Sequence, residues 1–373
     1  MARRPTVSDI ARASGVSVAT VDRVLNGRLP VREETARRVY DAANAIGYHA
    51  AALIRRRIEQ ELPQYRLGFI LQRPDQPFYQ AFARELDHVV NAAERFRGTA
   101  DIVHLDTQTP TEIAARLRET ASRCRAVGMV AIDHPAVTAA VAEAREKGVP
   151  VFSLLSDFAP GIRENYIGLN NRKVGRTAAW LIARTTGQPG TPGRPGTTTR
   201  PGTASRPGTA SRAGTASRPG KVAVFIGSHR FHGQEMREIG FRSYFREYAP
   251  GLELVETVVN LEDGDIAHEA TLDLFRRCPD LVGLYVGGGG MEGVIAALRE
   301  EGMAGRIVAI CNELTADSRA ALADDIVAMV IGTPLERLSR ELVAQMVHAI
   351  ENGPAETPGQ IFLPFDIFVA ENI

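Results

Sequence analysis

One stretch decides how the first part of this chain folds: Pro5-Thr-Val-Ser-Asp-Ile-Ala-Arg-Ala-Ser-Gly-Val-Ser-Val-Ala-Thr-Val-Asp-Arg-Val-Leu-Asn26. Thr6 is placed to cap a first helix, and Asp9 stands three residues later, where it can complete a capping box. Gly15 allows a tight turn because glycine adopts positive φ without penalty. Ser17 can then cap a second helix. The spacing therefore predicts two short helices joined by one turn.

Apolar side chains recur at helical spacing in this stretch and predict a small core. The inward positions are Val7, Ile10, Ala11, Val21, Val24 and Leu25. The outward face of the second helix is nearly free of large apolar side chains. A third helix is predicted from about Glu33 to Ala45, with an apolar stripe of Val39, Ala42, Ala43 and Ile46. Its two opening acids lie in the first turn, where the helix dipole favours them. We predict a small all-α helix-turn-helix headpiece over residues 1–48; the alternative is a generic three-helix bundle.

The charge of the chain is distributed unevenly. The 44 basic and 44 acidic residues cancel overall. Residues 1–60, however, hold eleven Arg and six acids, a net charge of +5, so the remainder carries −5. A basic segment of this kind suits contact with the phosphates of DNA.

The headpiece resembles the LacI/GalR family of bacterial transcription regulators. The matching positions are Thr6-Val-x-Asp9-Ile-Ala11, Gly15-Val-Ser17, Thr20-Val21, Arg23-Val24, Asn26 and Gly47-Tyr48. The resemblance implies that the second helix lies in the major groove of operator DNA. The DNA-binding residues it implies are Thr6, Ser17, Val18, Ala19, Thr20, Asp22, Arg23, Asn26 and Tyr48. Arg23 is the favoured base-reading residue, as a bidentate donor to guanine.

Asp22 departs from the family pattern, which usually has Ser at this position. A carboxylate close to phosphates should repel them. Two interpretations stay open: Asp22 accepts a hydrogen bond from a cytosine amino group, or it orients Arg23.

The segment after Tyr48 is the predicted hinge, residues 49–64, and it is also altered. The family usually carries a Pro-Asn pair here and later a Leu that enters the minor groove, whereas this chain reads His49-Ala-Ala-Ala-Leu-Ile-Arg-Arg-Arg-Ile58. The alanines favour a helix, and the arginines suit phosphates or a narrow minor groove. The hinge residues assigned to DNA are Arg55, Arg56 and Arg57. Ile54 or Ile58 is a candidate wedge, and the alternative is a solvated basic linker.

Composition bounds the class of protein. The 373 residues, 44% of them apolar, fit a soluble chain of more than one domain. No stretch approaches the roughly 20 apolar residues of a membrane span, and the first residues lack an apolar signal-peptide core. Cys124, Cys278 and Cys311 are widely spaced, which is typical of reduced core thiols. We expect a cytoplasmic protein without a membrane role.

From residue 65 onward, predicted strands alternate with helical patterns. The first series of strands covers 67–71, 100–105, 128–132 and 149–154. The second covers 166–169, 222–226, 252–259, 281–286 and 307–310. This alternation predicts an α/β body of parallel sheets covered by helices, arranged as two similar lobes with a cleft between them.

The body resembles the sugar-binding domain that the same family shares with periplasmic binding proteins. The motifs are Arg73-Pro-Asp75-x-Pro-Phe78, Ile167-Gly-Leu-Asn-Asn171-x-x-x-Gly175, Arg237-x-x-Gly240-Phe241 and Ile331-Gly-Thr-Pro334. The resemblance implies an effector-binding and dimerisation domain over 65–373, with three lobe crossovers, near Tyr166, near Gly332 and before Phe365. Lobe one is then 65–165 with 334–355, and lobe two is 166–332 with 360–373.

A six-residue repeat of Arg, Pro, Gly, Thr, Ala and Ser runs through residues 194–220. It offers no apolar side chain larger than Ala or Pro, so it cannot offset the entropy of ordering. We predict a disordered insertion over 187–220. A repeat solenoid is the alternative, and its arginines also allow weak, non-specific contact with DNA.

Polar and aromatic side chains follow several predicted strands, where α/β sheets bind ligands. The candidate effector-binding residues are Asp75, Phe78, Tyr79, Asp133, Ser153, Asp157, Arg237, Gly288 and Asn312. Arg237 matches a family arginine that binds sugar hydroxyls. The alternatives are core packing for Phe78, a solvated helix position for Arg237, and helix capping for Asp133 and Asp157.

The run Gly287-Gly-Gly-Gly290 falls where many family members place a ligand-binding Asn. Three interpretations stay open for it. The glycines let the backbone approach a larger ligand, or they form a hinge, or they cradle a phosphate, although no GK[ST] follows as in a P-loop.

No catalytic constellation is apparent, so we expect no enzyme. His229 and His232 lack a clear third ligand, so we expect neither a metal nor a cofactor. The sequence predicts a DNA-binding transcription regulator, most simply a repressor. It would act as a homodimer on double-stranded operator DNA and respond to a small sugar or polyol effector. The alternatives are a solute-binding protein of a sugar transport system and an enzyme on a similar body.

Overall fold

The computed structural model describes residues 4–26, 31–52, 54, 62–186 and 220–373. The predictions for Arg55, Arg56, Arg57, Ile58 and residues 187–219 of the predicted insertion lie outside these residues. Contacts within the chain define two units, Met1–Arg66 with Val90–Ala100 and Leu67–Val89 with Asp101–Ile373.

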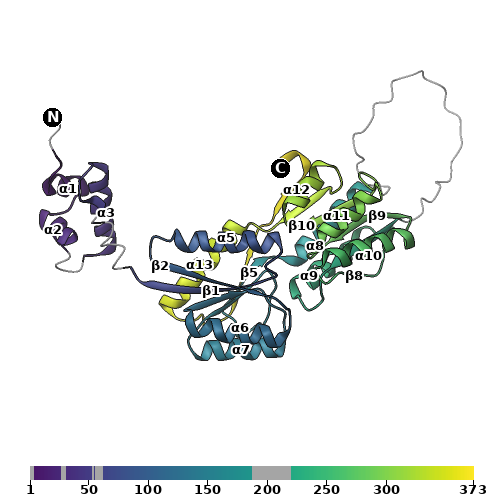
Figure 1. The fold of residues 1–373 in the computed structure, drawn as a ribbon, viewed down its shortest axis with the longest axis horizontal. Coiled ribbons are helices and arrows are strands. Elements are labelled where there is room, and N and C mark those ends of the chain that lie inside the picture. Colours follow the sequence, from purple (N-terminus) through teal and green to yellow (C-terminus); the bar gives the residue numbers. More distant parts are fainter. Residues whose placement is uncertain (1–3, 27–30, 53, 55–61, 187–219) are drawn as a thin grey trace, which may run out of the picture. The chain divides into compact units, whose positions relative to one another are not determined.

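The headpiece consists of α1 (Val7–Ser14), α2 (Val18–Asn26) and α3 (Glu33–Ala45) (Figure 1). Thr6 and Asp9 form the capping box, in which the Thr6 amide donates to the Asp9 carboxylate at 2.9 Å. Gly15 ends α1 with φ of 68°. The helix-turn-helix prediction is confirmed.

A small apolar core holds these three helices together. Its buried members are Ile10, Ala11, Val21, Val24, Ala36, Val39, Ala42, Ala43 and Ile54. Arg38 of α3 donates to the Ser14 carbonyl at 2.6 Å and so satisfies the C-terminal end of α1. Ile54 is fully buried in this core. The hypothesis that Ile54 is the minor-groove wedge is therefore wrong for this structure, because its side chain is already used in packing.

The body contains two sheets. In spatial order, the first is β12 (Gly359–Leu363), β5 (Asn165–Leu169), β4 (Val151–Leu154), β3 (Ala126–Met129), β1 (Gln64–Gln72) and β2 (Arg97–Leu105). The second is β13 (Asp366–Phe368), β11 (Met329–Gly332), β10 (Val308–Asn312), β9 (Leu281–Val286), β6 (Lys221–Ile226) and β7 (Glu253–Leu254), with β8 (Val258–Val259) also on β6.

Helices cover both sheets, as the alternating pattern predicts. Those of the first lobe are α5 (Pro77–Asn91), α6 (Pro110–Arg123), α7 (Pro135–Glu146) and α13 (Leu335–Asn352). Those of the second are α8 (Asn171–Thr185), α9 (His232–Tyr248), α10 (Gly264–Arg277), α11 (Met291–Glu300) and α12 (Ala316–Ala323), and η1 (Ala370–Asn372) follows β13. Gly68 of β1 faces α6, whereas Gly128 of β3 faces Leu342 of α13. Gly68 pairs with Val127 in register, so these two helices lie on opposite faces of the first sheet.

The expected lobe boundaries need one correction. β5 pairs in parallel with β4, and β12 pairs in parallel with β5, so Asn165–Leu169 and Gly359–Leu363 belong to the first sheet. The prediction placed both segments in lobe two. The chain crosses between the sheets after Leu169, after Gly332, and between Leu363 and Asp366, where β13 pairs antiparallel with β11.

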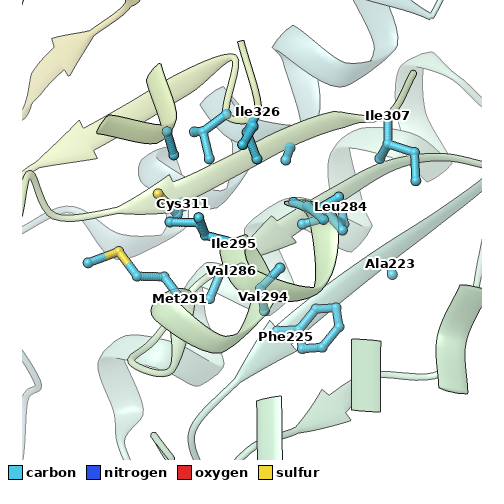
Figure 2. Close-up of a cluster of buried hydrophobic side chains, with 14 of the residues drawn as sticks. Ala223, Phe225, Leu284, Val286, Met291, Val294, Ile295, Ile307, Cys311 and Ile326 are labelled. Carbon is cyan, nitrogen blue, oxygen red and sulfur yellow. The ribbon is translucent and has the colours of Figure 1, made fainter. Parts of the chain in front are cut away.

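The core of the second lobe shows why its strands are so apolar. Ala223 and Phe225 of β6 and Leu284 and Val286 of β9 point to the same face, two residues apart on each strand (Figure 2). There they pack against α11, which contributes buried Met291, Val294 and Ile295. The other face packs on α8, since a Cβ on Gly283 would meet Ile182. Both faces are covered, so alternation between polar and apolar residues is lost.

Two glycines of the predicted motifs allow α8 and α9 to cross closely. A Cβ on Gly175 would collide with the Arg237 carbonyl, and one on Gly240 with the Arg172 carbonyl. Neither glycine has positive φ. Their role is therefore close backbone approach, and it positions Arg237 at the cleft.

Cys124, Cys278 and Cys311 are all buried. Among the residues that the structure describes, none of the helices has the length and apolar character needed to cross a bilayer.

Candidate functional site

A cavity lies between the two lobes of the body, and we call it the cleft. Its empty space measures about 710 Å³, a volume that includes solvent open to the outside. Its lining comes from the segments that follow the strands of both sheets: Gln76, Pro77, Phe78, Tyr79, Val130, Leu155, Ser156, Phe231, Gly233, Gln234, Arg237, Glu262, Gly288, Gly289, Met291, Glu292, Asn312, Glu313 and Thr315. The position at the carboxyl ends of parallel strands is the usual one for ligands in α/β folds.

Arg237 is the buried cation of the cleft and is 8% exposed. Its Nε donates to the Asn171 side chain at 2.8 Å, and its Nη1 donates to the Gly287 carbonyl at 2.9 Å. Asn171 in turn donates to the Leu155 carbonyl at 3.0 Å. Arg237 thus ties α9 to α8, to the segment after β9 and, through Asn171, to the first lobe.

Glu262 is the most connected acid of the cleft. Its Oε1 accepts from Gln234 at 2.6 Å, and its Oε2 accepts from Gln108 of the first lobe at 3.4 Å. The Glu262 carbonyl accepts from Gln76 at 3.3 Å and Arg73 at 3.4 Å, both also of the first lobe. This one residue of the second lobe therefore receives three donors from across the cleft.

Asn312 is the last residue of β10, and Glu313 follows it directly. The Glu313 carboxylate accepts from the Thr333 amide at 2.9 Å and from its hydroxyl at 2.8 Å. The Asn312 oxygen accepts from the Tyr285 hydroxyl at 2.6 Å. The Asn312 Nδ2 is buried with no hydrogen-bond partner among the described residues. A buried donor without an acceptor is costly, so this amide is suited to a ligand oxygen.

Burial dominates the electrostatics of the cleft. It raises the pKa of Glu262, of Glu292 and of Glu313 above the ordinary glutamate value. Burial, together with the charges of Glu262 and Glu313, also raises the pKa of Tyr79 well above its ordinary value. The shared direction means that the cleft disfavours its own negative charges.

The glycine run before α11 is explained by these side chains. A Cβ on Gly288 would lie 2.7 Å from Oε1 of Gln234, and one on Gly289 would lie 2.9 Å from the Cβ of Glu262. Gly290 has φ of 82°, a conformation that glycine adopts without strain. The space left by the missing side chains is thus filled by Gln234 and Glu262.

The outward surface of α2 is the second candidate site. Ser17, Val18, Ala19, Arg23 and Asn26 are exposed, and Thr20 and Asp22 are half-buried. Ser17 caps the helix by accepting from the Thr20 amide at 3.1 Å. Asp22 accepts from the Asn26 side chain at 2.6 Å. Thr6 lies in the α1 cap, and Tyr48 packs partly against the headpiece core.

Comparison with known proteins gives the family. Residues 6–50 match the model for bacterial regulatory proteins of the lacI family, and residues 67–354 match that for a periplasmic binding protein domain. The chain belongs to the lacI family of bacterial regulatory proteins.

Among similar proteins, the HTH-type transcriptional regulator GalR of Escherichia coli is 28% identical over half of each chain. The ribose operon repressor of Bacillus subtilis is 36% identical over 23% of this chain and 26% of that protein. This lacI-family chain spans about half the length of the first curated relatives it matches. An ABC transporter solute-binding protein from Burkholderia graminis, solved with D-arabinose, shares the fold with a TM-score of 0.67. It is 18% identical, over 82% of this chain and 96% of that one.

Five of the predicted effector residues come together in the cleft of this lacI-family protein. They are Phe78, Tyr79, Arg237, Gly288 and Asn312. Four others do not line it: Asp75, Asp133, Ser153 and Asp157. For these four the structure corrects the prediction, since each has another role.

Asp75 is exposed and pairs with Arg73, and Asp133 accepts from the Ala159 amide at 3.1 Å. Ser153 donates to Asp157 at 2.7 Å. Burial alone would raise the pKa of Asp157, but hydrogen bonds from Arg163, Ser153 and Gln360 outweigh it and lower the pKa. Asp157 is therefore the centre of a structural network at the lobe crossover.

Sequence reasoning missed several lining residues, above all Gln234, Glu262, Glu292 and Glu313. Glu313 directly follows the predicted Asn312, and Glu292 comes two residues after the glycine run, so their positions alone could have indicated them. Glu262 follows only the short strand β8 and had no such signal.

The raised pKa of Glu292 predicts a pH-dependent stability. The folded protein holds this proton to a higher pH than the unfolded chain. The contribution to stability is therefore full below the ordinary glutamate value and falls as pH rises through the raised pKa. We expect Glu292→Gln to raise the melting temperature of the ligand-free protein by a few degrees at pH 8, about what 1 kcal/mol produces, and to have little effect near pH 4.

The control is Glu301→Gln, which removes an exposed acid at the other end of α11. It should leave the melting temperature nearly unchanged at both pH values in differential scanning calorimetry. An equal shift at pH 4 and pH 8 for Glu292→Gln would contradict the interpretation.

Proposed function

We propose that this protein is a sequence-specific DNA-binding transcription regulator, a repressor controlled by a small carbohydrate-like effector in the cleft. One observation carries the proposal: a single chain joins a helix-turn-helix headpiece with an exposed, polar α2 surface to a two-lobe domain with a lined cavity. The headpiece favours a DNA role over that of a solute-binding protein. We also propose that the protein acts in the cytoplasm.

The headpiece supplies the chemistry for reading DNA. Arg23 is exposed on α2, so its guanidinium is available as a bidentate donor to a guanine in the major groove. Ser17, Thr20 and Asn26 offer neutral donors to phosphates, and Asp22 holds the Asn26 amide in place. We propose a homodimer on a near-palindromic operator, because two-fold symmetry doubles the contacts of one headpiece.

The cleft is the proposed site at which the effector controls DNA binding. Effector contacts with Phe78, Tyr79, Arg237, Gly288 and Asn312 would involve both lobes, so an effector that fills the cleft changes how the lobes close. The relatives favour a carbohydrate: a ribose operon repressor by name, and a solute-binding protein solved with D-arabinose. Closure would reach the headpieces as a change in their spacing and so change operator affinity.

The DNA-reading role of Arg23 predicts a specific loss. Selection of random duplexes on the full chain should enrich a near-palindromic site. Arg23→Ala should weaken binding to that site by about 5- to 150-fold, the equivalent of about 1–3 kcal/mol, and relax base preference at one position of each half-site. Fluorescence anisotropy at fixed salt measures both effects.

The matched control is Arg276→Ala, which removes an exposed arginine of α10 in the body. Its operator affinity should equal that of the parent protein. Unchanged affinity and base preference in Arg23→Ala would remove Arg23 from the interface.

Control by the cleft predicts reciprocal coupling. A monosaccharide that stabilises the protein in a thermal-shift screen should change operator Kd by about 5- to 150-fold. Operator DNA must then change the affinity for that sugar by the same factor, measured by isothermal titration calorimetry. A sugar that binds with the same Kd with and without operator would refute the proposed control.

A further inference from the structure

The charged residues that line the cleft do not balance. They are Glu262, Glu292, Glu313 and Arg237, a formal charge of −2. Burial is extensive: Glu262 is 7% exposed and Arg237 is 8% exposed. Buried carboxylates are normally paired, because an isolated charge in a low-dielectric site is costly.

Arg237 does not neutralise these acids by direct contact. Its bonded donors, Nε and Nη1, go to neutral acceptors, the Asn171 side chain and the Gly287 carbonyl. No ion pair joins it to any of the three acids in the part of the chain that the structure describes. Arg73 donates to the Glu262 main-chain carbonyl, acts on the carboxyl groups of Glu262 and Glu292 through its field, and pairs directly with Asp75.

Two of the acids have a backbone conformation that costs free energy. Glu262 has φ of 56° and Glu313 has φ of 70°, in the left-handed region that residues with a Cβ adopt rarely. Such strain persists only where the surroundings impose it, and it concentrates at binding sites. For Glu262 the surroundings are visible: the Asn260 side chain accepts from its amide at 3.0 Å and donates to the Gly289 carbonyl at 2.8 Å.

The donors that the carboxylates of these acids receive inside the protein are neutral. Glu262 accepts from Gln234 and Gln108, and Glu313 accepts from Thr333. Glu292 lies in the first turn of α11 and has no side-chain donor among the described residues. Burial raises its pKa, and the charges of Asp317 and Glu262 add to that effect. Glu292 is thus the acid most in need of a partner.

A second and independent observation points to a ligand. Asn312 is 2% exposed, lines the cleft, and has a buried amide nitrogen with no acceptor. It requires an oxygen, not a cation. Half-buried Phe78 and buried Phe231 supply apolar walls beside these polar groups. The cleft is therefore suited to a small molecule that carries both a positive charge and an oxygen acceptor.

We propose that the effector is a cationic carbohydrate, an amino sugar or aminated polyol, whose ammonium group binds at Glu292 while a hydroxyl or ring oxygen accepts from Asn312. This assignment rests on the proposed function only for the effect of the ligand on DNA. A protonated amine supplies three donors and one positive charge at once, which reduces the formal charge of the cleft from −2 to −1. A neutral sugar would give the acids hydroxyl donors but leave the charge of −2 uncompensated.

Matched ligands test the proposal on the full chain at pH 7. The probes are D-glucosamine, D-galactosamine, D-mannosamine and D-glucamine, each against its neutral parent, D-glucose, D-galactose, D-mannose and D-sorbitol. The N-acetylated hexosamines keep the nitrogen and the ring hydroxyls but lose the charge and gain an acetyl group. Isothermal titration calorimetry should show at least one amine that binds tenfold or more tightly than both its neutral parent and its acetylated form.

Two variants assign the interaction to residues. Glu292→Gln should remove the tenfold preference for the amine over its neutral parent. Asn312→Ala should weaken both by a similar factor. Glu301→Gln, at the far end of the same helix, should keep the preference, which separates local pairing from a general field. Circular dichroism melts establish that each variant is folded.

The outcomes separate this inference from the proposed function. Neutral probes that bind as tightly as the amines, or no binding by any probe, overturn the cationic effector. If a neutral sugar releases operator DNA, the regulator stands and the cationic effector falls. If an amine binds with dependence on Glu292 and operator affinity does not change, the ligand class stands and the regulatory role falls.

Discussion

The body of this protein depends on where one buried carboxylate is placed. Glu262 accepts hydrogen bonds from Gln234 in its own lobe and from Gln108 in the other, while its carbonyl accepts from Gln76 and Arg73. These bonds require a strained backbone at Glu262 and the burial of its carboxylate, and both of these lower the stability of the fold. They connect the two lobes, and a ligand in the same cavity can strengthen or break that connection.

Much of the remaining architecture supports that connection. The glycines after β9 leave room for Gln234 and Glu262, and Gly175 and Gly240 let α8 and α9 approach so that Arg237 reaches Asn171. The apolar strands beneath are covered on both faces and give these polar side chains a rigid base. In the headpiece, Asp22 likewise has a partner within the protein, because its carboxylate accepts a hydrogen bond from the Asn26 side chain.

Local patterns made the headpiece predictable. Thr6, Asp9, Gly15 and Ser17 act within a few residues of one another, so their spacing alone indicates the caps and the turn. The two-lobe α/β body could likewise be predicted from alternating strands and helices. The edge strand β12 could not, because its place beside β5 depends on pairing across almost 200 residues of sequence.

The cleft was only partly predictable. Asn312 and Phe78 follow predicted strands and indeed line it, but Asp157 follows a strand too and is taken by Arg163. Which polar side chain faces a cavity and which is consumed by a neighbour depends on long-range packing. Glu262 owes its position to its left-handed φ and to hydrogen bonds from three distant segments, around Arg73–Gln76, Gln108 and Gln234, and local sequence indicates none of these.

The distance between the lobes tests most directly whether Glu262 joins them. Spin labels at Ala115 of α6 and Glu269 of α10, both exposed, report this distance by pulsed electron paramagnetic resonance in the ligand-free full chain. Glu262→Ala should shift the distribution to longer distances or broaden it, whereas Glu301→Ala should leave it as in the parent protein. Identical distributions for Glu262→Ala and the parent would contradict the account.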